Sequence, residues 1–428
     1  WVLKMPGEVA LSDDEQALLD GARGPAMQLA MRTVLQAARI MGAPRLIPAC
    51  FAHIDACFYA GQAHVDFARF LATHEASFAV PTWTNNGLVS LERPDLRAGR
   101  SDRETVDGAR ELMQLYVELG ARPVWTCAPY QLPDRPGLGD HIIAAESNAV
   151  TFYNSAVGAR TNKYGDFLDV ACALTGKVPL ARLHTDEGRR GTVLVKTDEV
   201  GERLKREGIF YHVLGYAVGR RVGRAVPVID GLPGDTGEDD MKAVSAAVAA
   251  AGGVELWHGV GVTPEAPSID AAFGSRVPEE VISLGMGEMV EARDRLSSGR
   301  DGALDMIALG TPHFSLTEFA ALAELVDGRK LHDGLKAYIT TSRFIRDLAN
   351  AQGLTDQLER SGFEIITDTC TYFSPKVTGC TGRAMTNAAK WAYYAPGMLG
   401  VEVCFGSLKE CVESAVRGEV WRDPELWR

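Results

Sequence analysis

The sequence lacks the cysteine patterns that mark zinc ribbons and disulfide scaffolds. No two cysteines are separated by two residues, so a CxxC zinc site and a thioredoxin-like redox motif are excluded. Eight cysteines in 428 residues are also too few for a disulfide framework. Most are expected to be small buried residues that a reducing compartment keeps as thiols. They are Cys50, Cys57, Cys127, Cys172, Cys370, Cys380, Cys404 and Cys411.

Positive charge, long apolar runs and phosphate-binding glycine motifs are also scarce. Lys and Arg number 44 against 56 Asp and Glu, and the net charge of −12 excludes a uniformly basic nucleic-acid-binding surface. The glycine-rich stretches contain no GxGxxG, GxxxxGK[ST] or GxSxG motif. No run approaches the ~20 uncharged apolar residues that span a bilayer. We therefore expect a cytoplasmic protein with neither a nucleic-acid nor a membrane partner.

Apolar runs typical of strands alternate with helical patterns along the chain. Such alternation predicts βαβ units and largely parallel sheets, hence an α/β fold. We expect two or three α/β/α subdomains within residues 1–428, arranged around one central cleft. Predicted strands cover residues 45–50, 77–80, 122–127, 304–309, 337–341 and 363–367, and predicted helices cover 11–41, 239–251, 316–326 and 408–416.

Several strand-end segments are too polar for simple connections. Ligands of parallel α/β folds bind at the carboxyl ends of the strands, so these segments are the candidate site. Any one of them alone is equally well explained as turn chemistry, but six together favour a site. They cover residues 52–57, 81–86, 126–130, 309–315, 367–370 and 385–390.

A further polar run over residues 145–162 predicts a helix with chemistry at both ends. Glu146 lies near its start, and Asn148 and Ser155 are seven residues apart and share one face. Arg160 follows Gly158 at its end and suits a bidentate grip on a carboxylate. An ordinary surface arginine is the alternative for Arg160.

In order along nearly the whole chain, these segments resemble the large catalytic region of the aconitase X family. The resemblance implies an aconitase-like fold and a hydro-lyase assisted by an iron–sulfur cluster. It rests on His53-Ile54-Asp55, Thr126-Cys127-Ala128-Pro129-Tyr130, Glu146-Ser147, Gly158-Ala159-Arg160-Thr161-Asn162, Gly261-Val262-Thr263-Pro264-Glu265-Ala266, Gly310-Thr311-Pro312-His313, Thr367-Asp368-Thr369-Cys370, Met385-Thr386-Asn387, Lys390 and Tyr394-Ala395-Pro396-Gly397.

Family members dehydrate either cis-3-hydroxy-L-proline or mevalonate 5-phosphate, and two departures separate these types. The mevalonate-phosphate type carries a cysteine ligand where this chain has Thr311, and it does not usually show Cys57 or Cys380. Both departures favour the hydroxyproline type, which yields Δ1-pyrroline-2-carboxylate, with a [2Fe–2S] cluster. Mevalonate 5-phosphate dehydratase is the alternative activity. A non-catalytic α/β subunit that binds a small molecule is the alternative from another functional class.

The resemblance also assigns roles to individual residues. Cys127 and Cys370 match family ligand positions for the metal centre, and Cys380, then Cys57, are inferred as the third ligand. His53, Asp55 and Lys390 are the candidate catalytic residues. The candidate substrate-binding residues are Asn86, Glu146, Ser147, Arg160, Thr161, Asn162, Thr311 and His313.

The chain opens on Trp1 and matches only a catalytic region. In aconitase-like enzymes the proton-abstracting serine tends to come from a separate swivelling domain. We therefore expect a small swivel domain, fused upstream or present as a separate chain, and the base to lie on it.

Overall fold

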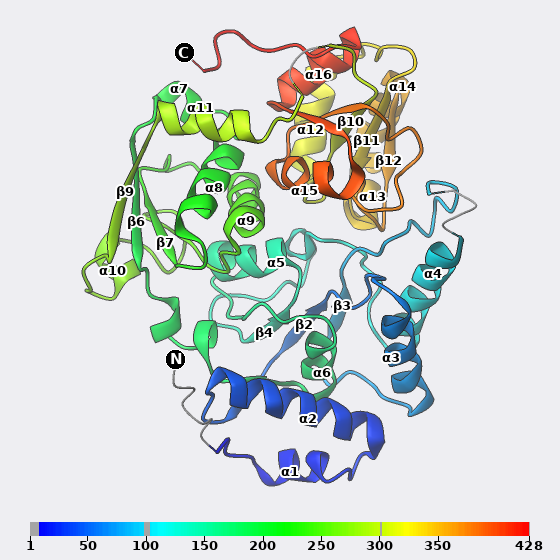
Figure 1. Cartoon of the computed structure of the whole chain (residues 1–428), viewed down its shortest axis with the longest axis vertical. Helices are drawn as coiled ribbons and strands as arrows, with labels where there is room; N and C mark the ends of the chain where they lie inside the picture. The colour runs from blue at the N-terminus through cyan, green and yellow to red at the C-terminus, as the bar shows by residue number, and fades with distance from the viewer. Residues whose placement is uncertain (1–7, 98–102, 300–301, 428) are drawn as a thin grey trace.

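The computed structural model describes residues 8–97, 103–299 and 302–427, and it confirms an α/β architecture (Figure 1). Three sheets of three to five strands are parallel, and β1 pairs with β5 in an antiparallel sheet. Within these ranges no helix combines the length and apolarity that crossing a bilayer requires.

The N-terminal part builds its parallel sheet in the strand order β3-β2-β4. After α5, the chain continues as one π-helical stretch over Tyr153–Val157 and stops at Gly158, whose φ of 76° suits glycine. The strands are β1 (Leu46–Pro48), β2 (Phe51–Ile54), β3 (Thr82–Thr84), β4 (Ile142–Ala144) and β5 (Lys177–Pro179). The helices are α1 (Asp13–Leu19), α2 (Gly24–Met41), α3 (Gln62–Thr73), α4 (Arg103–Glu118), α5 (Ser147–Phe152) and α6 (Leu168–Thr175).

The middle part carries a four-stranded parallel sheet in the order β8-β7-β6-β9. Its helices α8 and α9 cross closely because a Cβ on Gly215 would lie 2.6 Å from the Val244 carbonyl oxygen. The strands are β6 (Val193–Glu199), β7 (Pro227–Asp230), β8 (His258–Gly259) and β9 (Glu280–Gly285). The helices are α7 (Glu202–Lys205), α8 (Gly208–Val222), α9 (Glu238–Gly252), α10 (Ile269–Phe273) and α11 (Met286–Arg295).

The C-terminal part is a doubly covered parallel sheet in the order β12-β11-β10-β13-β14 (Figure 1). Ile307, Leu309 and Ile339 from its central strands lie in a buried core of its own. The strands are β10 (Met306–Leu309), β11 (Lys336–Thr340), β12 (Phe363–Ile366), β13 (Arg383–Thr386) and β14 (Glu402–Phe405). The helices are α12 (Leu316–Val326), α13 (Arg343–Ala351), α14 (Leu354–Ser361), α15 (Ala389–Leu399) and α16 (Leu408–Arg417).

The carboxyl ends of the first and last parallel sheets face one another at the middle of the molecule (Figure 1). The backbone N–H of Gly87, after β3, donates to the carbonyl of Asp368, after β12, over 2.8 Å. Thr126 likewise contacts His313, which follows β10, through a 3.0 Å hydrogen bond. The strand-end segments from distant parts of the chain therefore come together, as the sequence predicted.

Three predicted elements differ from the structure. The single helix predicted over residues 11–41 is two helices, because Gly21 and Gly24 adopt φ values of 88° and 85° that break the helix. No strand forms over residues 77–80 or 122–127, and β3 begins instead at Thr82. Arg122 makes only an isolated bridge to Trp83, and Trp125 has a φ of 43°, which an extended strand does not accommodate.

Candidate functional site

Two thiols and one imidazole converge where the sheet ends meet. Sγ of Cys127, Sγ of Cys370 and a ring nitrogen of His313 all lie within 4.8 Å of one another, and all three residues are buried. The backbone N–H of His313 also donates to the Cys127 sulfur over 3.4 Å. We call Cys127, His313 and Cys370 the triad.

The triad has the chemistry of a soft-metal site. Burial raises the pKa of the Cys370 thiol well above its usual value, and the neighbouring Cys127 sulfur raises it further. A bound cation reverses this shift, because it stabilises thiolates that would otherwise repel each other in a buried place. Thiolates and imidazole are ligands of iron–sulfur clusters and of zinc. The residues present therefore fit a metal centre.

The His313 ring is held on both sides by the protein. Nδ1 lies 3.0 Å from Thr126 Oγ1, and Nε2 lies 3.2 Å from the Thr369 carbonyl oxygen. Burial lowers the pKa of His313 to about 4, so the imidazole is neutral at physiological pH. A neutral imidazole is the form that ligates metals, and a metal here would replace one of these two hydrogen bonds.

A buried ion pair, Lys390 with Glu146, lies next to the triad. Lys390 comes from α15, and its Nζ donates to Glu146 Oε1 at the N-terminus of α5. Burial lowers the pKa of Lys390, but the charges of Glu146 and Cys127 outweigh it and hold that pKa above its usual value. Burial also raises the pKa of Glu146, but Lys390 keeps it below its usual value. Both groups are therefore charged inside a dry site.

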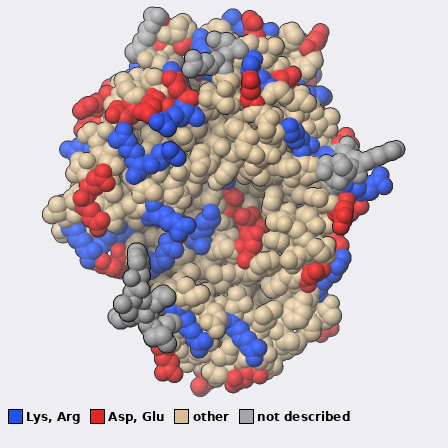
Figure 2. Space-filling view, viewed as in Figure 1, with Lys and Arg blue, Asp and Glu red and all other residues tan. Residues whose placement is uncertain are grey.

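His53 lies in β2, and Asp55 directly follows that strand. His53 Nε2 lies 2.9 Å from the Thr126 carbonyl oxygen, and burial lowers the pKa of His53 to about 4. Asp55 Oδ1 accepts a 2.5 Å hydrogen bond from Asn85 Nδ2, after β3. Burial, followed by the charge of Glu146, raises the pKa of Asp55 to about 8. Figure 2 shows that the face of the molecule seen in that view is hollowed near its centre, where Asp and Glu side chains gather.

Several buried polar atoms on these strand-end segments have no hydrogen-bond partner among the described residues. They are His53 Nδ1, Asn85 Oδ1, Asn86 Nδ2, Thr311 Oγ1 and Asn387 Oδ1. An unpaired buried polar group costs about 1–3 kcal/mol, so such a group is normally satisfied by a ligand or by water. Their concentration around the triad indicates a polar ligand site.

The structure brings some predicted residues into this site and leaves others apart. Ser147 lies beside Glu146, with its Oγ 3.4 Å from Glu146 Oε1. Cys57 directs its thiol to the carbonyls of Ile54 and Asn85, and neither Cys57 nor Cys380 joins the group of potential metal ligands found among the described residues.

Residues 160–162 lie away from the triad. Arg160 forms a 2.6 Å ion pair with Asp186 at a pocket of about 180 Å³ beside Glu265. The side chains of Thr161 and Asn162 are fully buried and are used by backbone groups: Thr161 Oγ1 accepts from the Ala144 N–H, and Asn162 Oδ1 accepts from the Leu183 N–H.

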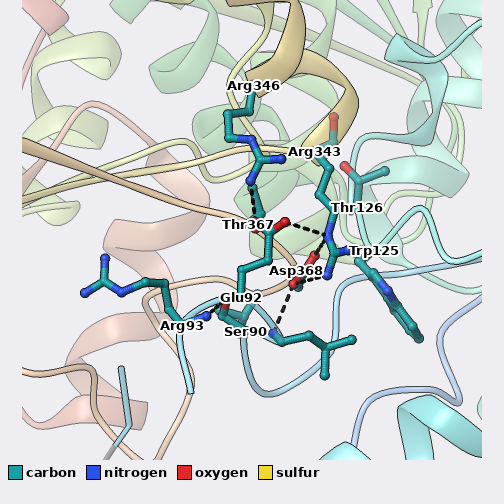
Figure 3. Close-up of polar contacts among 12 residues, drawn as sticks. Ser90, Glu92, Arg93, Trp125, Thr126, Arg343, Arg346, Thr367 and Asp368 are labelled. Carbon is teal, nitrogen blue, oxygen red and sulfur yellow. Dashed lines mark hydrogen bonds and ion pairs between the residues drawn. The ribbon is translucent and has the colours of Figure 1, made fainter. Parts of the chain in front are cut away.

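The loop that carries Cys370 is fastened to the N-terminal part by buried polar contacts. Figure 3 shows Arg343 facing Asp368, which lies two residues before Cys370, and the two side chains form bonds of 2.7 and 2.8 Å. The same carboxylate accepts the Leu91 N–H over 3.0 Å. Arg97 donates to the carbonyls of Phe373 and Cys370 and to Thr369 Oγ1. Asp368 and Arg97 are thus structural supports of the triad.

Sequence reasoning missed four contributors to the site. Asn85 and Asn387 lie within polar strand-end segments that the sequence does single out, so their position was a usable signal. Asp169, which accepts the Asp55 N–H over 2.7 Å, and Arg97 lie outside those segments. Nothing in their local sequence distinguishes them from ordinary helix and loop residues.

Family models match the chain in three consecutive stretches. The aconitase X first domain matches residues 8–187, the second domain residues 191–294 and the third domain residues 304–417. The triad draws Cys127 from the first stretch and His313 and Cys370 from the third.

Curated relatives and a solved structure agree with these matches. The chain is 42% identical to a cis-3-hydroxy-L-proline dehydratase of Pseudomonas aeruginosa, over 94% of this chain and 69% of that one. It is 40% identical to a protein of the same name from Hypocrea jecorina, over 96% and 69%. A phosphomevalonate dehydratase large subunit of Methanocaldococcus jannaschii is 30% identical, over 94% and 99%. Aconitase X of Thermococcus kodakaraensis, in its holo-form, superposes with a TM-score of 0.85 at 32% identity, covering 95% of this chain and all of that one.

Proposed function

The chain belongs to the aconitase X family, and on that basis we propose that it is a hydro-lyase of hydroxyproline metabolism that converts cis-3-hydroxy-L-proline to Δ1-pyrroline-2-carboxylate. The observation that carries the reaction class is the convergence of the Cys127 and Cys370 thiols beside the charged Lys390–Glu146 pair. The choice of substrate is supported by the names of the relatives at 42% and 40% identity.

We assign an iron–sulfur cluster, of the [2Fe–2S] type, to Cys127 and Cys370, with His313 as the third group offered to it. When bound, such a centre supplies a Lewis acid for the departing hydroxyl group. The donor chemistry and burial of the triad support the assignment. Cys380 and Cys57 are less suited than His313, because their side chains lie outside the group.

The remaining residues bind and orient the substrate. Lys390, charged and buried, holds the substrate carboxylate in a place from which water is excluded. The unpaired groups of Asn86, Thr311 and Asn387 supply hydrogen bonds to the hydroxyl group. Together these contacts fix the Cα–Cβ bond, across which water is lost.

The proton-abstracting base is proposed to lie on a small swivel domain, carried by the same polypeptide or by a companion chain. The name "large subunit" of the archaeal relatives, which this chain matches over 99% of one such protein, supports a two-part enzyme. The protein is proposed to act in the cytoplasm.

The basic side chains around the triad favour an amino acid over a phosphorylated substrate. A phosphate dianion is bound by free Arg and Lys side chains. Here Arg343 pairs with Asp368, and Arg97 donates to backbone carbonyls. These cations are used within the protein.

Cys127→Ser and Cys370→Ser test the proposal, with exposed Cys50→Ser as the matched control. In protein purified anaerobically together with its swivel domain, each of the first two variants is expected to lose iron, labile sulfide and dehydration of cis-3-hydroxy-L-proline, while the control keeps all three. Iron K-edge anomalous scattering would locate the metal at the triad. Iron-free protein that dehydrates the substrate at the full rate would sink the proposal.

A further inference from the structure

Asp55 and Asn85 form a hydrogen-bonded pair in which one acceptor atom has no donor among the described residues. Asn85 gives its Nδ2 proton to Asp55 Oδ1, which fixes the two side chains against each other. Asn85 is only 3% exposed, yet its Oδ1 has no partner among the described residues. The Asn85 carbonyl oxygen can therefore accept a hydrogen bond from a ligand.

The backbone holds this acceptor pair in place. The N–H groups of Asp55 and Ala56 both donate to Asp169 Oδ2, over 2.7 and 3.2 Å. The Asn85 N–H donates to the Ile54 carbonyl over 2.9 Å, which ties the end of β3 to the end of β2. Asp55 and Asn85 are therefore preorganised by the sheet and by α6.

The surroundings of the pair are acidic. Glu146, Asp166 and Asp169 all act on Asp55 as like charges, and they raise its pKa in addition to the effect of burial. Lys390 lies beside Glu146, and the His64 ring lies 3.2 Å from Asp166. A cationic ligand next to Asp55 would relieve this repulsion.

We propose that Asp55 and Asn85 Oδ1 are the subsite for the ring ammonium of the substrate, an inference that rests on the proposed function. A pyrrolidine ammonium carries two N–H donors, and the pair offers it two acceptor oxygens, one from the carboxyl group of Asp55 and one from the amide of Asn85. Charge-assisted bonds of this kind are among the stronger hydrogen bonds in proteins. Asp55 is thus a substrate-binding residue that selects an amino acid.

This subsite and Lys390 bind the two oppositely charged groups of one small molecule. The ammonium lies at Asp55 and the carboxylate at Lys390, so the amino acid is bound at both of its charged groups. A phosphorylated hydroxy acid has no nitrogen, leaves Asn85 Oδ1 unpaired and brings an anion to an acidic wall. Two effects therefore separate the two substrate types. A substrate without nitrogen leaves Asn85 Oδ1 unpaired, and it also lacks the attraction between an ammonium and Asp55.

Two ligands that differ only at the nitrogen test the subsite. L-Proline and cyclopentanecarboxylate have rings of the same size, and only the first carries an ammonium. Binding of each to the purified full chain, with its metal and any companion chain, is measured by calorimetry. We expect wild type to bind L-proline about tenfold or more tightly than cyclopentanecarboxylate, and Asp55→Asn to abolish that preference while cyclopentanecarboxylate affinity changes less than about threefold.

Asp166→Asn is the matched control, because it removes a carboxylate of the same wall that contacts His64 and not Asn85. It is expected to keep most of the preference for L-proline, and Asn85→Ala to lose part of it. Equal affinity of wild type for both ligands, or an equal loss of both in Asp55→Asn, overturns the subsite. A retained, Asp55-dependent preference in a chain that does not dehydrate hydroxyproline supports the subsite and refutes only the proposed function.

Discussion

Arg97 is a buried arginine whose described hydrogen-bond partners are all neutral oxygen atoms. Its guanidinium donates to the carbonyls of Phe373, Pro375 and Cys370 and to Thr369 Oγ1. Burial lowers the pKa of Arg97 to about 10, so the side chain still carries its charge at neutral pH. One residue from the N-terminal part therefore fixes the loop that presents Cys370.

Replacing Arg97 by Met is expected to weaken both the fold and metal retention. The carbonyls of Phe373 and Cys370 lose their donor while staying buried, which costs about 1–3 kcal/mol for each unsatisfied group. Urea denaturation measures the free energy of unfolding, and iron assays measure the metal held per chain. Arg93→Met is the control, because Arg93 pairs with Glu364 at a partly exposed position.

An Arg97→Met variant that loses stability but keeps its full iron content would show that Arg97 supports the loop without positioning Cys370. Arg97→Lys is expected to be intermediate, because one ammonium does not reach all the carbonyls that the planar guanidinium spans.

At the residue scale, the sequence predicts which segments reach the site better than it predicts which residues contact one another there. Cys127, His313 and Cys370 all lie in strand-end segments, and the rule for parallel sheets brought them together correctly. Cys380 is inferred as a ligand from its closeness to Cys370 in sequence, but it does not join the group of potential ligands found among the described residues. Asp169 supports Asp55 from α6, and no local pattern encodes a contact between residues so far apart.

At the element scale, the N-terminus of α12 joins the middle and C-terminal parts. Ser315 and Glu318 form a capping box, in which Ser315 Oγ accepts the Glu318 N–H over 3.1 Å and Glu318 accepts the Ser315 N–H over 2.8 Å. Ser315 Oγ also donates to Asp239 of α9 over 2.8 Å, and Lys242 of α9 pairs with Glu318. One helix cap thus serves as an interdomain contact.

Ser315→Ala is expected to lower the free energy of unfolding by about 2 kcal/mol. Loss of an N-cap costs about 0.5–2 kcal/mol, and loss of the bond to Asp239 adds to it. Ser268→Ala is the control, because Ser268 caps α10 at an exposed place through the Ala271 N–H alone. Thermal or urea unfolding measures both variants, and equal losses would contradict the interdomain role of Ser315.

The helices of the C-terminal part are predicted more accurately than the short strands near the site. Residues 316–326 form the predicted helix because an amphipathic pattern follows a capping box. Residues 122–127 have strand composition but form no strand, since Trp125 turns the backbone to bring Thr126 and Cys127 into the site. Such a departure from local preference is typical of a functional segment.

At the scale of the whole molecule, buried neutral histidines set part of the acid stability. Burial, assisted by His141 and nearby arginines, lowers the pKa of His184 to about 3. An unfolded histidine takes up a proton below about pH 6.5, whereas the folded one does not until about pH 3. Lowering the pH through this window therefore stabilises the unfolded state. Asp55 and Asp169, whose pKa values are raised to about 8 and 7, act in the opposite direction.

His184→Gln separates the contribution of His184 to the pH dependence of stability from the contributions of Asp55 and Asp169. The variant loses the bond to Tyr164 and is expected to be less stable than wild type at pH 7. The difference in free energy of unfolding between wild type and the variant should shrink by about 2 kcal/mol at pH 5. At that pH a proton binds His184 in unfolded wild type and stabilises its unfolded state, whereas the variant has no histidine at this position. Urea denaturation at the two pH values measures it, and a constant difference would show that His184 does not titrate in this way.

More than half of the chain separates Cys127 from Cys370, and this separation sets when the triad first exists. During translation, the ribosome releases Cys370 only after the whole N-terminal and middle parts have emerged. Cys127 then waits without its partners until the C-terminal sheet has been made. A metal centre held by all three residues can accordingly form only after residue 370 has been made, and a chain interrupted before that residue has no complete site to receive it.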